Sequence, residues 1–316
     1  MKTLKFRDND EMPTLGLGTW NSKLGEVYKA VKTAIKIGYR HIDCAMIYGN
    51  QEEIGQALSD SISEGVVARK DIWVTSKLWN NSHAKVDVIA ALRSTLEDLQ
   101  IDYLDLYLIH WPVALKKEVL YPQSAEDMLA LNQVPITETW TSMEEAAELG
   151  LTKHIGVSNF GVKTLTQLIS NCKIVPEMNQ VESHPYLQQK ELLAFCHSND
   201  IHYTAYCPLG SSNRPERLKT ENEPILLDDP IINEIAKSKN VTAAQILISW
   251  ARHRGVSVIP KSTNEGRILQ NFNIGKIDLS EDEMQRISAL DRHHRYISGE
   301  TWVFDGGPYT VEEIFG

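Results

Sequence analysis

The chain has 316 residues, 42% of them hydrophobic, which is enough for the buried core of one large domain or two ordinary ones. Its 42 acidic residues outnumber 32 basic ones, so the formal net charge is −10, and no basic block stands out; nucleic acids and anionic membranes are therefore poor candidate partners. No apolar run could span a bilayer, the N-terminus lacks a signal-peptide core, and the four cysteines form no CxxC pair, so we expect a reducing compartment, the cytoplasm, and no metal site.

The first predicted element is a short amphipathic start, TLKF followed by DND, which indicates an N-terminal β-hairpin. Eight short apolar runs rich in Val, Ile and Tyr then recur along the chain, most of them bounded by turn residues. Such runs are typical of strands covered on both faces. We expect strands within residues 14–20, 39–45, 72–79, 103–111, 154–159, 176–183, 202–210 and 256–262.

Helical patterns, in which apolar residues recur on one face, alternate with these strands. They predict helices at residues 26–36, 51–58, 85–99, 138–149, 162–170, 189–197 and 243–252. Two of these helices have candidate N-caps in Ser82 and Thr242. Because successive parallel strands need a crossover, usually a helix, the alternation predicts parallel pairing.

The number of units favours an α/β fold of the (β/α)₈ TIM-barrel type. An open doubly wound sheet usually carries a GxGxxG turn after its first strand, and LGLGTW does not supply one. No repeat or low-complexity linker divides the chain, so we expect a single domain over residues 1–316. Residues 112–135 and 210–230 are predicted long loops at the C-terminal face of the barrel, where long loops are usually functional.

Chemically active side chains follow several predicted strand ends, which in a barrel meet at one mouth. Asp43 ends the second strand with Tyr48 just beyond it, Lys77 lies in the third, and His110 ends the fourth. Taken singly, they could be a structural ion pair, a packed phenol and a core histidine. Together they predict an active site, ringed by Trp20, Trp79 and Trp111.

Elementary chemistry gives these four residues roles. A free phenol has a pKa of about 10 and is a feeble proton donor at neutral pH. We expect the Lys77 ammonium, held charged by Asp43, to lower the pKa of Tyr48, which would then act as a general acid toward a developing alkoxide. His110 would orient a carbonyl oxygen and stabilise charge on it. No side chain supplies a hydride, so a cofactor must.

From LGLGTW to GPYTVEEIFG, nearly the whole chain resembles the aldo-keto reductases, most closely the aldose, xylose and plant aldehyde reductases. The motifs that carry the likeness are GYRHIDCAMIYGNQEEIG, YLDLYLIHWPV, GLTKHIGVSNF and VIPKSTNEGRILQNF. The resemblance implies a (β/α)₈ barrel that reduces aldehydes and some ketones with NADPH. It also implies a catalytic tetrad, matched here by Asp43, Tyr48, Lys77 and His110.

The same resemblance implies an NADPH site and a substrate pocket. Tyr206 matches a residue that stacks on the nicotinamide. Ser158, Asn159 and Gln180 match the residues that hydrogen-bond to the nicotinamide's carboxamide. Lys261, Ser262 and Arg267 match the residues around the adenosine 2′-phosphate. The remaining implied cofactor contacts are Thr19, Trp20, Cys207, Leu209, Ser211, Pro260, Thr263, Gln270 and Asn271. The implied substrate-binding residues are Trp20, Tyr48, Trp79, His110, Trp111, Tyr121 and Trp302.

The chain departs from many family members at four positions. Gln270 stands where many have an acid, and Cys207 where many have Ser. The loop at residues 210–230 resembles a belt over the cofactor pyrophosphate, but Asn21 and Asn213 stand where many relatives have a Lys–Asp latch. We therefore predict a weaker latch and faster release of NADP⁺.

Two other functions compete with carbonyl reduction. A barrel aldolase would use Lys77 as a neutral amine that forms a Schiff base, which the nearby Asp43 disfavours. A non-catalytic NADPH-binding barrel would not need the intact tetrad. The sequence predicts a small-molecule carbonyl substrate without identifying it, and the family default is a monomer.

Overall fold

The computed structural model describes residues 2–275 and 277–316, and at its centre is one parallel sheet of eight strands. Seven of these strands lie within a predicted apolar run, and β9 overlaps its run but begins two residues earlier, at Thr152; nearly all of their residues are buried. The strands are β3 (Leu17–Gly18), β4 (His41–Asp43), β5 (Trp73–Leu78), β6 (Leu104–Ile109), β9 (Thr152–Ser158), β10 (Met178–Glu182), β11 (His202–Tyr206) and β12 (Ser257–Val258).

The sheet closes on itself where β3 meets β12. Leu15 pairs with Val258 and Gly18 with Lys261 in isolated parallel bridges, and the Gly18 N–H donates to the Pro260 carbonyl at 3.2 Å. A Cβ at Gly18 would lie 2.5 Å from the Ile259 carbonyl oxygen, so only glycine permits this approach. The predicted α/β (β/α)₈ barrel is therefore confirmed.

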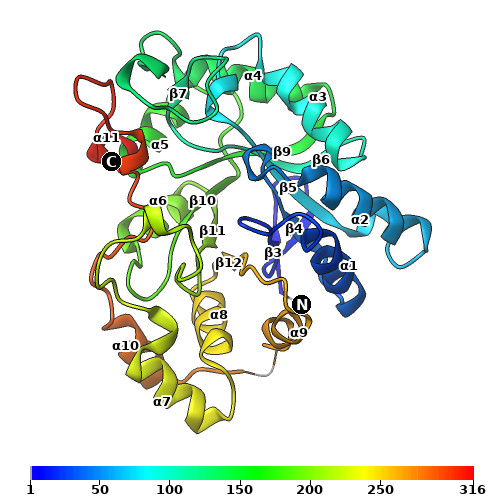
Figure 1. Ribbon diagram of the computed structural model, residues 1–316, viewed down its shortest axis with the longest axis vertical. Coiled ribbons are helices and arrows are strands. Elements are labelled where there is room, and N and C mark those ends of the chain that lie inside the picture. Colours follow the sequence, from blue (N-terminus) through cyan, green and yellow to red (C-terminus); the bar gives the residue numbers. More distant parts are fainter. Residues whose placement is uncertain (1, 276) are drawn as a thin grey trace.

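Helices surround the strands (Figure 1). They are α1 (Val27–Ile37), α2 (Gln51–Ser63), α3 (Val88–Leu99), α4 (Ile136–Glu148), α5 (Val162–Ile169), α6 (Lys190–Ser198), α7 (Pro230–Lys239), α8 (Ala243–His253), α9 (Glu265–Phe272), α10 (Glu281–Ser288) and α11 (Val311–Phe315). Most of these helices pack an apolar stripe into the main hydrophobic core, because that contact removes it from water.

The positions at which helices begin were predicted less well than the presence of the helices. The predicted cap at Thr242 is confirmed: its hydroxyl accepts from the Gln245 N–H at 3.2 Å, and the Gln245 side chain accepts from the Thr242 N–H at 3.0 Å. The predicted cap at Ser82 is wrong, because Ser82 lies in a 3₁₀ turn (Asn80–Ser82) and α3 begins only after Asp87. The sequence analysis did not predict α7, α9, α10 or α11.

The predicted N-terminal hairpin is present as β1 (Thr3–Lys5) and β2 (Glu11–Pro13). The loop at 112–135 contains a small antiparallel pair, β7 (Ala114–Leu115) and β8 (Met128–Leu129), and the loop at 210–230 contains two 3₁₀ turns. In the described part of the chain, no helix combines the length and the apolar character that a membrane span requires.

Candidate active site

A cavity of about 470 Å³ opens at the C-terminal ends of the barrel strands, a volume typical of small-molecule sites. Predicted site residues that line it are Thr19, Trp20, Asp43, Tyr48, Trp79, His110, Trp111, Tyr121, Ser158, Asn159, Gln180, Tyr206, Cys207, Leu209, Ser211, Pro260, Lys261, Ser262, Thr263, Arg267 and Trp302. Three predicted residues do not line it. Lys77 lies behind Asp43 and Tyr48, while Gln270 and Asn271 lie in α9 outside the cavity wall.

Asp43, Tyr48 and His110 form the polar floor of the cavity, and Lys77 lies buried beneath it, with 1% of its surface exposed. Its ammonium donates to Asp43 Oδ1 at 2.6 Å and to the Cys44 carbonyl at 2.8 Å, and it lies 3.5 Å from Tyr48 Oη. An ammonium has three N–H donors, so these three acceptors use all of them. The arrangement favours a charged lysine, and it disfavours the neutral amine that a Schiff base needs.

The environment of Tyr48 differs from the one that we expected. We predicted that Lys77 would lower the pKa of this phenol, and that prediction is wrong. Withdrawal from bulk water raises the pKa of Tyr48 well above its usual value, and the Asp43 carboxylate acts in the same direction. Asp43 also neutralises Lys77 at 2.6 Å, so little of the ammonium's attraction remains for the phenolate. Tyr48 is therefore protonated, which is the form that a proton donor requires.

His110 is held in its neutral form. Burial lowers the pKa of this imidazole well below its usual value, and the Lys77 ammonium adds to the effect. Its ring lines the cavity, 5.9 Å from the Tyr48 ring and 5.1 Å from the Trp79 ring between centroids. A neutral imidazole still carries one N–H, so His110 can donate a hydrogen bond to an oxygen in the cavity.

Polar side chains in or just after β9, β10 and β11 form a hydrogen-bonded network beside this floor. Gln180 donates its amide N–H to Asp43 Oδ2 at 2.7 Å, so both carboxylate oxygens of Asp43 are bonded. Asn159, in the left-handed region with φ 66°, donates to the His110 carbonyl at 2.9 Å and accepts from the Tyr206 hydroxyl at 2.7 Å. Ser158 donates to the Gln180 carbonyl at 2.7 Å. These contacts fix the side chains that were predicted to hold a carboxamide.

The far end of the cavity is basic. Lys261 donates to the Asn21 carbonyl at 2.9 Å, and Arg267 lies in the first turn of α9, where Asn264 caps its N–H at 3.0 Å. Burial lowers the pKa of Lys261; the negative charge of Glu26 opposes this shift, and the positive charge of Arg267 adds to it. Neither cation forms an ion pair with a carboxylate of residues 2–275 or 277–316. Two such cations beside a helix N-terminus suit a phosphate dianion.

An aromatic wall lies opposite. The Trp302 ring is 5.7 Å from that of Trp79 and 5.5 Å from that of Trp111, and Tyr121 stands half exposed at the rim. Residues that the sequence analysis missed also line the cavity: Gly18, Ile47, Pro208, Gly210, Ser212, Arg217, Leu218, Leu227, Ile259, Tyr296, Ile297, Ser298, Gly299 and Thr301. Part of this wall is held by buried Glu182, which accepts the backbone N–H groups of Tyr296 at 2.7 Å and Ile297 at 2.9 Å. Loop residues have no periodicity, so no pattern in the sequence identifies them.

The predicted belt crosses one side of the cavity. The Asn21 amide donates to the backbone carbonyl of Asn213 at 2.8 Å, so this contact does not involve the Asn213 side chain. Inside the belt, Arg214 is almost fully buried, pairs with Glu223, donates to the Ser211 carbonyl at 2.8 Å and lies over the Tyr296 ring. A buried guanidinium with these partners organises the belt without the ionic latch.

Comparisons with known proteins show the family and the fold of the chain. The model of the Aldo/keto reductase family matches residues 14–292. An aldo/keto reductase of Synechocystis sp., slr0942, is 48% identical over 315 residues, which are 100% of this chain and 96% of that protein. Aldo-keto reductase family 1 member A1 of Xenopus tropicalis is 48% identical over 91% of this chain and 88% of its own length. The aldose reductase structure from Schistosoma japonicum superposes with a TM-score of 0.89 at 37% identity, covering 100% of this chain and 98% of the other.

Proposed function

The chain belongs to the aldo/keto reductase family of oxidoreductases, and from that premise we propose that it reduces aldehydes to alcohols with NADPH. The observation that carries the proposal is the buried Lys77 ammonium, which joins Asp43 to Tyr48 at the floor of a cavity that His110 also lines. Aldoses and some ketones fall within the same reaction class. That the protein is cytoplasmic and that it is a monomer remain predictions.

The residues present fit NADPH at two separate places. Lys261 and Arg267 form a basic end, and neither makes a direct ion pair with a carboxylate of the described residues, which suits the 2′-phosphate. Near the tetrad, the Tyr206 ring lines the cavity next to Ser158 and Asn159, which suits a nicotinamide with its carboxamide. When bound, NADPH would supply the hydride that the side chains lack.

Within the reaction, the chain's own groups would hold the carbonyl and move one proton. His110 and Tyr48 would both donate hydrogen bonds to the carbonyl oxygen, which polarises the carbonyl and accommodates charge that develops on the oxygen. Tyr48 would then pass its proton to that oxygen as general acid. Lys77 and Asp43 would act on the phenolate that remains, because the ammonium is in contact range and Asp43 holds it in place.

The aromatic wall bears on the class of substrate. Trp20, Trp79, Trp111 and Trp302 give the outer cavity an apolar surface, while the polar groups gather on its floor. A hydrophobic or aromatic aldehyde would bury its body against the rings and direct its carbonyl to the floor. Sugar rings also pack on aromatic faces, so aldoses belong in the same substrate panel.

The test is NADPH consumption, followed by absorbance, with aromatic aldehydes, medium-chain aldehydes and aldoses. We expect turnover with at least the apolar aldehydes. Absence of consumption across the panel, with NADPH still bound, would instead support a non-catalytic barrel. Trapping of a substrate adduct on Lys77 by borohydride would support the aldolase alternative.

A further inference from the structure

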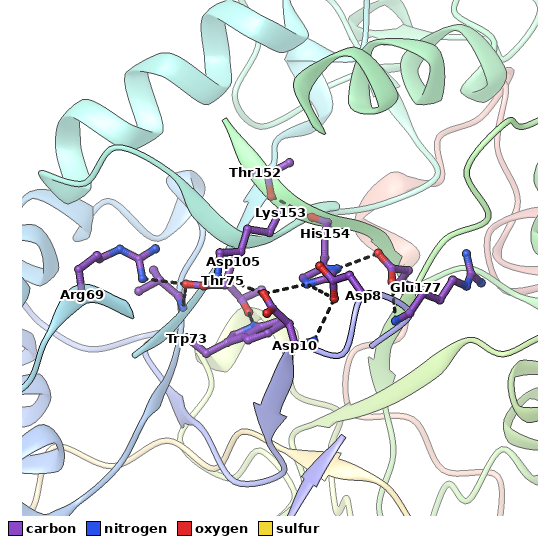
Figure 2. Close-up of polar contacts among 12 residues, drawn as sticks. Asp8, Asp10, Arg69, Trp73, Thr75, Asp105, Thr152, Lys153, His154 and Glu177 are labelled. Carbon is purple, nitrogen blue, oxygen red and sulfur yellow. Dashed lines mark hydrogen bonds and ion pairs between the residues drawn. The ribbon is translucent and has the colours of Figure 1, made fainter. Parts of the chain in front are cut away.

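The closed end of the barrel, opposite the cavity, holds a charged cluster that the proposed function does not use (Figure 2). It brings Asp8 and Asp10, from the turn of the N-terminal hairpin, next to His154 in β9. His154 is 2% exposed, and its ring is stacked on Trp73 with 5.3 Å between centroids and packed against Phe6 at 4.5 Å. The imidazole is therefore held in one orientation.

The two nitrogens of His154 have different surroundings. Nδ1 lies 2.9 Å from Glu177 Oε2, which fixes a proton on that nitrogen and leaves the other free to act as a ligand. Nε2 has no hydrogen-bond partner among the described residues, and it points between Asp8 Oδ1 at 3.6 Å and Asp10 Oδ2 at 3.5 Å. Both separations are longer than an N–H···O hydrogen bond.

These separations match those between ligands of one small cation. Nitrogen and oxygen ligands about 2.0–2.2 Å from a tetrahedral zinc ion lie about 3.3–3.5 Å apart. The ligand atoms of Asp8, Asp10 and His154 all lie within 4.8 Å of one another. One imidazole and two carboxylates, with a fourth position left for water, is a donor set that zinc accepts.

The charge of the cluster also favours a divalent cation. Four carboxylates, from Asp8, Asp10, Asp105 and Glu177, meet two cations that pair with them, Lys153 and Arg69. The Arg7 guanidinium instead donates to the Val175 carbonyl at 3.0 Å. With a neutral imidazole, two negative charges remain.

We propose that Asp8, Asp10 and His154 bind one Zn²⁺ ion, that Glu177 orients the imidazole, and that the ion ties the hairpin turn to the barrel. The sequence analysis expected no metal site, because spacing along the chain does not bring residues 8–10 near residue 154. The site is far from the cavity floor, so its role would be structural.

Calorimetric titration of chelator-treated protein with ZnCl₂ tests the site without any use of enzyme activity. We expect one site that is weakened at least tenfold in His154→Gln and in Asp8→Asn/Asp10→Asn. The matched control is Asp102→Asn, which removes an exposed carboxylate near the N-terminal end of β6 and should leave zinc binding unchanged. The same affinity and stoichiometry in all four proteins would overturn the proposal.

Two further variants separate zinc binding from a protonated histidine held by ion pairs. Glu177→Gln should weaken zinc binding by about 10–100-fold, as expected when the partner of a ligating histidine is lost. Lys153→Met should tighten it, because Lys153 Nζ lies 3.1 Å from the proposed ligand Asp10 Oδ2 and repels a second cation. Unchanged or weaker binding in Lys153→Met would contradict the proposal, even if the histidine variant failed to fold.

Discussion

At the scale of single residues, the proposed proton transfer depends on the hydroxyl of Tyr48. Tyr48→Phe removes this donor and leaves Lys261 and Arg267 at the basic end untouched. We expect kcat to fall by about 10²–10⁴-fold, because that is the usual contribution of a general acid, with little change in the Kd for NADPH. Steady-state kinetics and fluorescence titration measure the two quantities. Near-parental kcat would show that the proton comes from elsewhere.

Lys77 and Asp43 should reveal their coupling through stability. Lys77→Met leaves the Asp43 carboxylate buried without its cation, which typically costs about 3–5 kcal/mol in the free energy of unfolding. The matched variant Lys77→Met/Asp43→Asn removes both charges and should recover much of that loss. Urea denaturation measures the free energy of unfolding of the parental protein, the single variant and the double variant. Equal destabilisation of the single and double variants would mean that the two residues are not coupled.

Arg267 is the residue through which we expect the chain to distinguish the two nicotinamide cofactors. Arg267→Ala should weaken NADPH binding by about 1.5–3 kcal/mol, the range for a hydrogen bond to a charged group. NADH, which lacks the 2′-phosphate, serves as the control and should bind almost as before. If fluorescence titration gave equal losses for both cofactors, Arg267 would not recognise the phosphate.

The identities of these residues could be predicted from the sequence, but their electrostatics could not. Asp43, Tyr48 and His110 stand at or near predicted strand ends, and barrel geometry places such ends together. The pKa of Tyr48 depends instead on how much water the surrounding loops remove, and that quantity has no local pattern. The partner of Gln180 was also unpredicted, because Asp43 belongs to another strand.

At the scale of elements, the belt makes a prediction that separates two neighbouring asparagines. The Asn21 side chain bonds to the backbone of Asn213, so Asn21→Gly should lose the contact while Asn213→Ala keeps it. Glycine also preserves the positive φ of 54° at position 21. One hydrogen bond is worth about 0.5–1.5 kcal/mol, so NADP⁺ release should accelerate about 2–10-fold in Asn21→Gly only. Stopped-flow fluorescence that shows equal rates in both variants would rule out this contact as the latch.

The elements that the sequence predicted are those with a repeating pattern. The eight strands lie in or overlap short runs that are mostly apolar, and helices such as α1 and α8 carry a clear apolar stripe. In contrast, α10 is strongly polar and buries only Ile287, so periodicity does not single it out. The cap at Ser82 was predicted wrongly because a polar residue before an apolar stripe also occurs in a 3₁₀ turn.

At the scale of the whole molecule, the two ends of the barrel differ in structure. The C-terminal end holds the cavity, and the N-terminal end is closed by the hairpin over an apolar layer that includes Phe6, Met12 and Trp73. The alternation of strands and helices predicts this architecture, and the resemblance to a family predicts the chemistry. The substrate does not follow from either, because the outer wall consists of irregular segments such as residues 296–302, whose positions depend on distant partners like Glu182.

The most direct test of the central claim uses NADPH in which deuterium replaces the hydrogen that is transferred as hydride. An aldehyde substrate is turned over with this cofactor, and mass spectrometry of the alcohol locates the label. We predict one deuterium on the carbinol carbon with the parental protein and almost no labelled alcohol with Tyr48→Phe. An alcohol without the label, or equal labelling by the variant, would contradict carbonyl reduction by hydride transfer with Tyr48 as the acid.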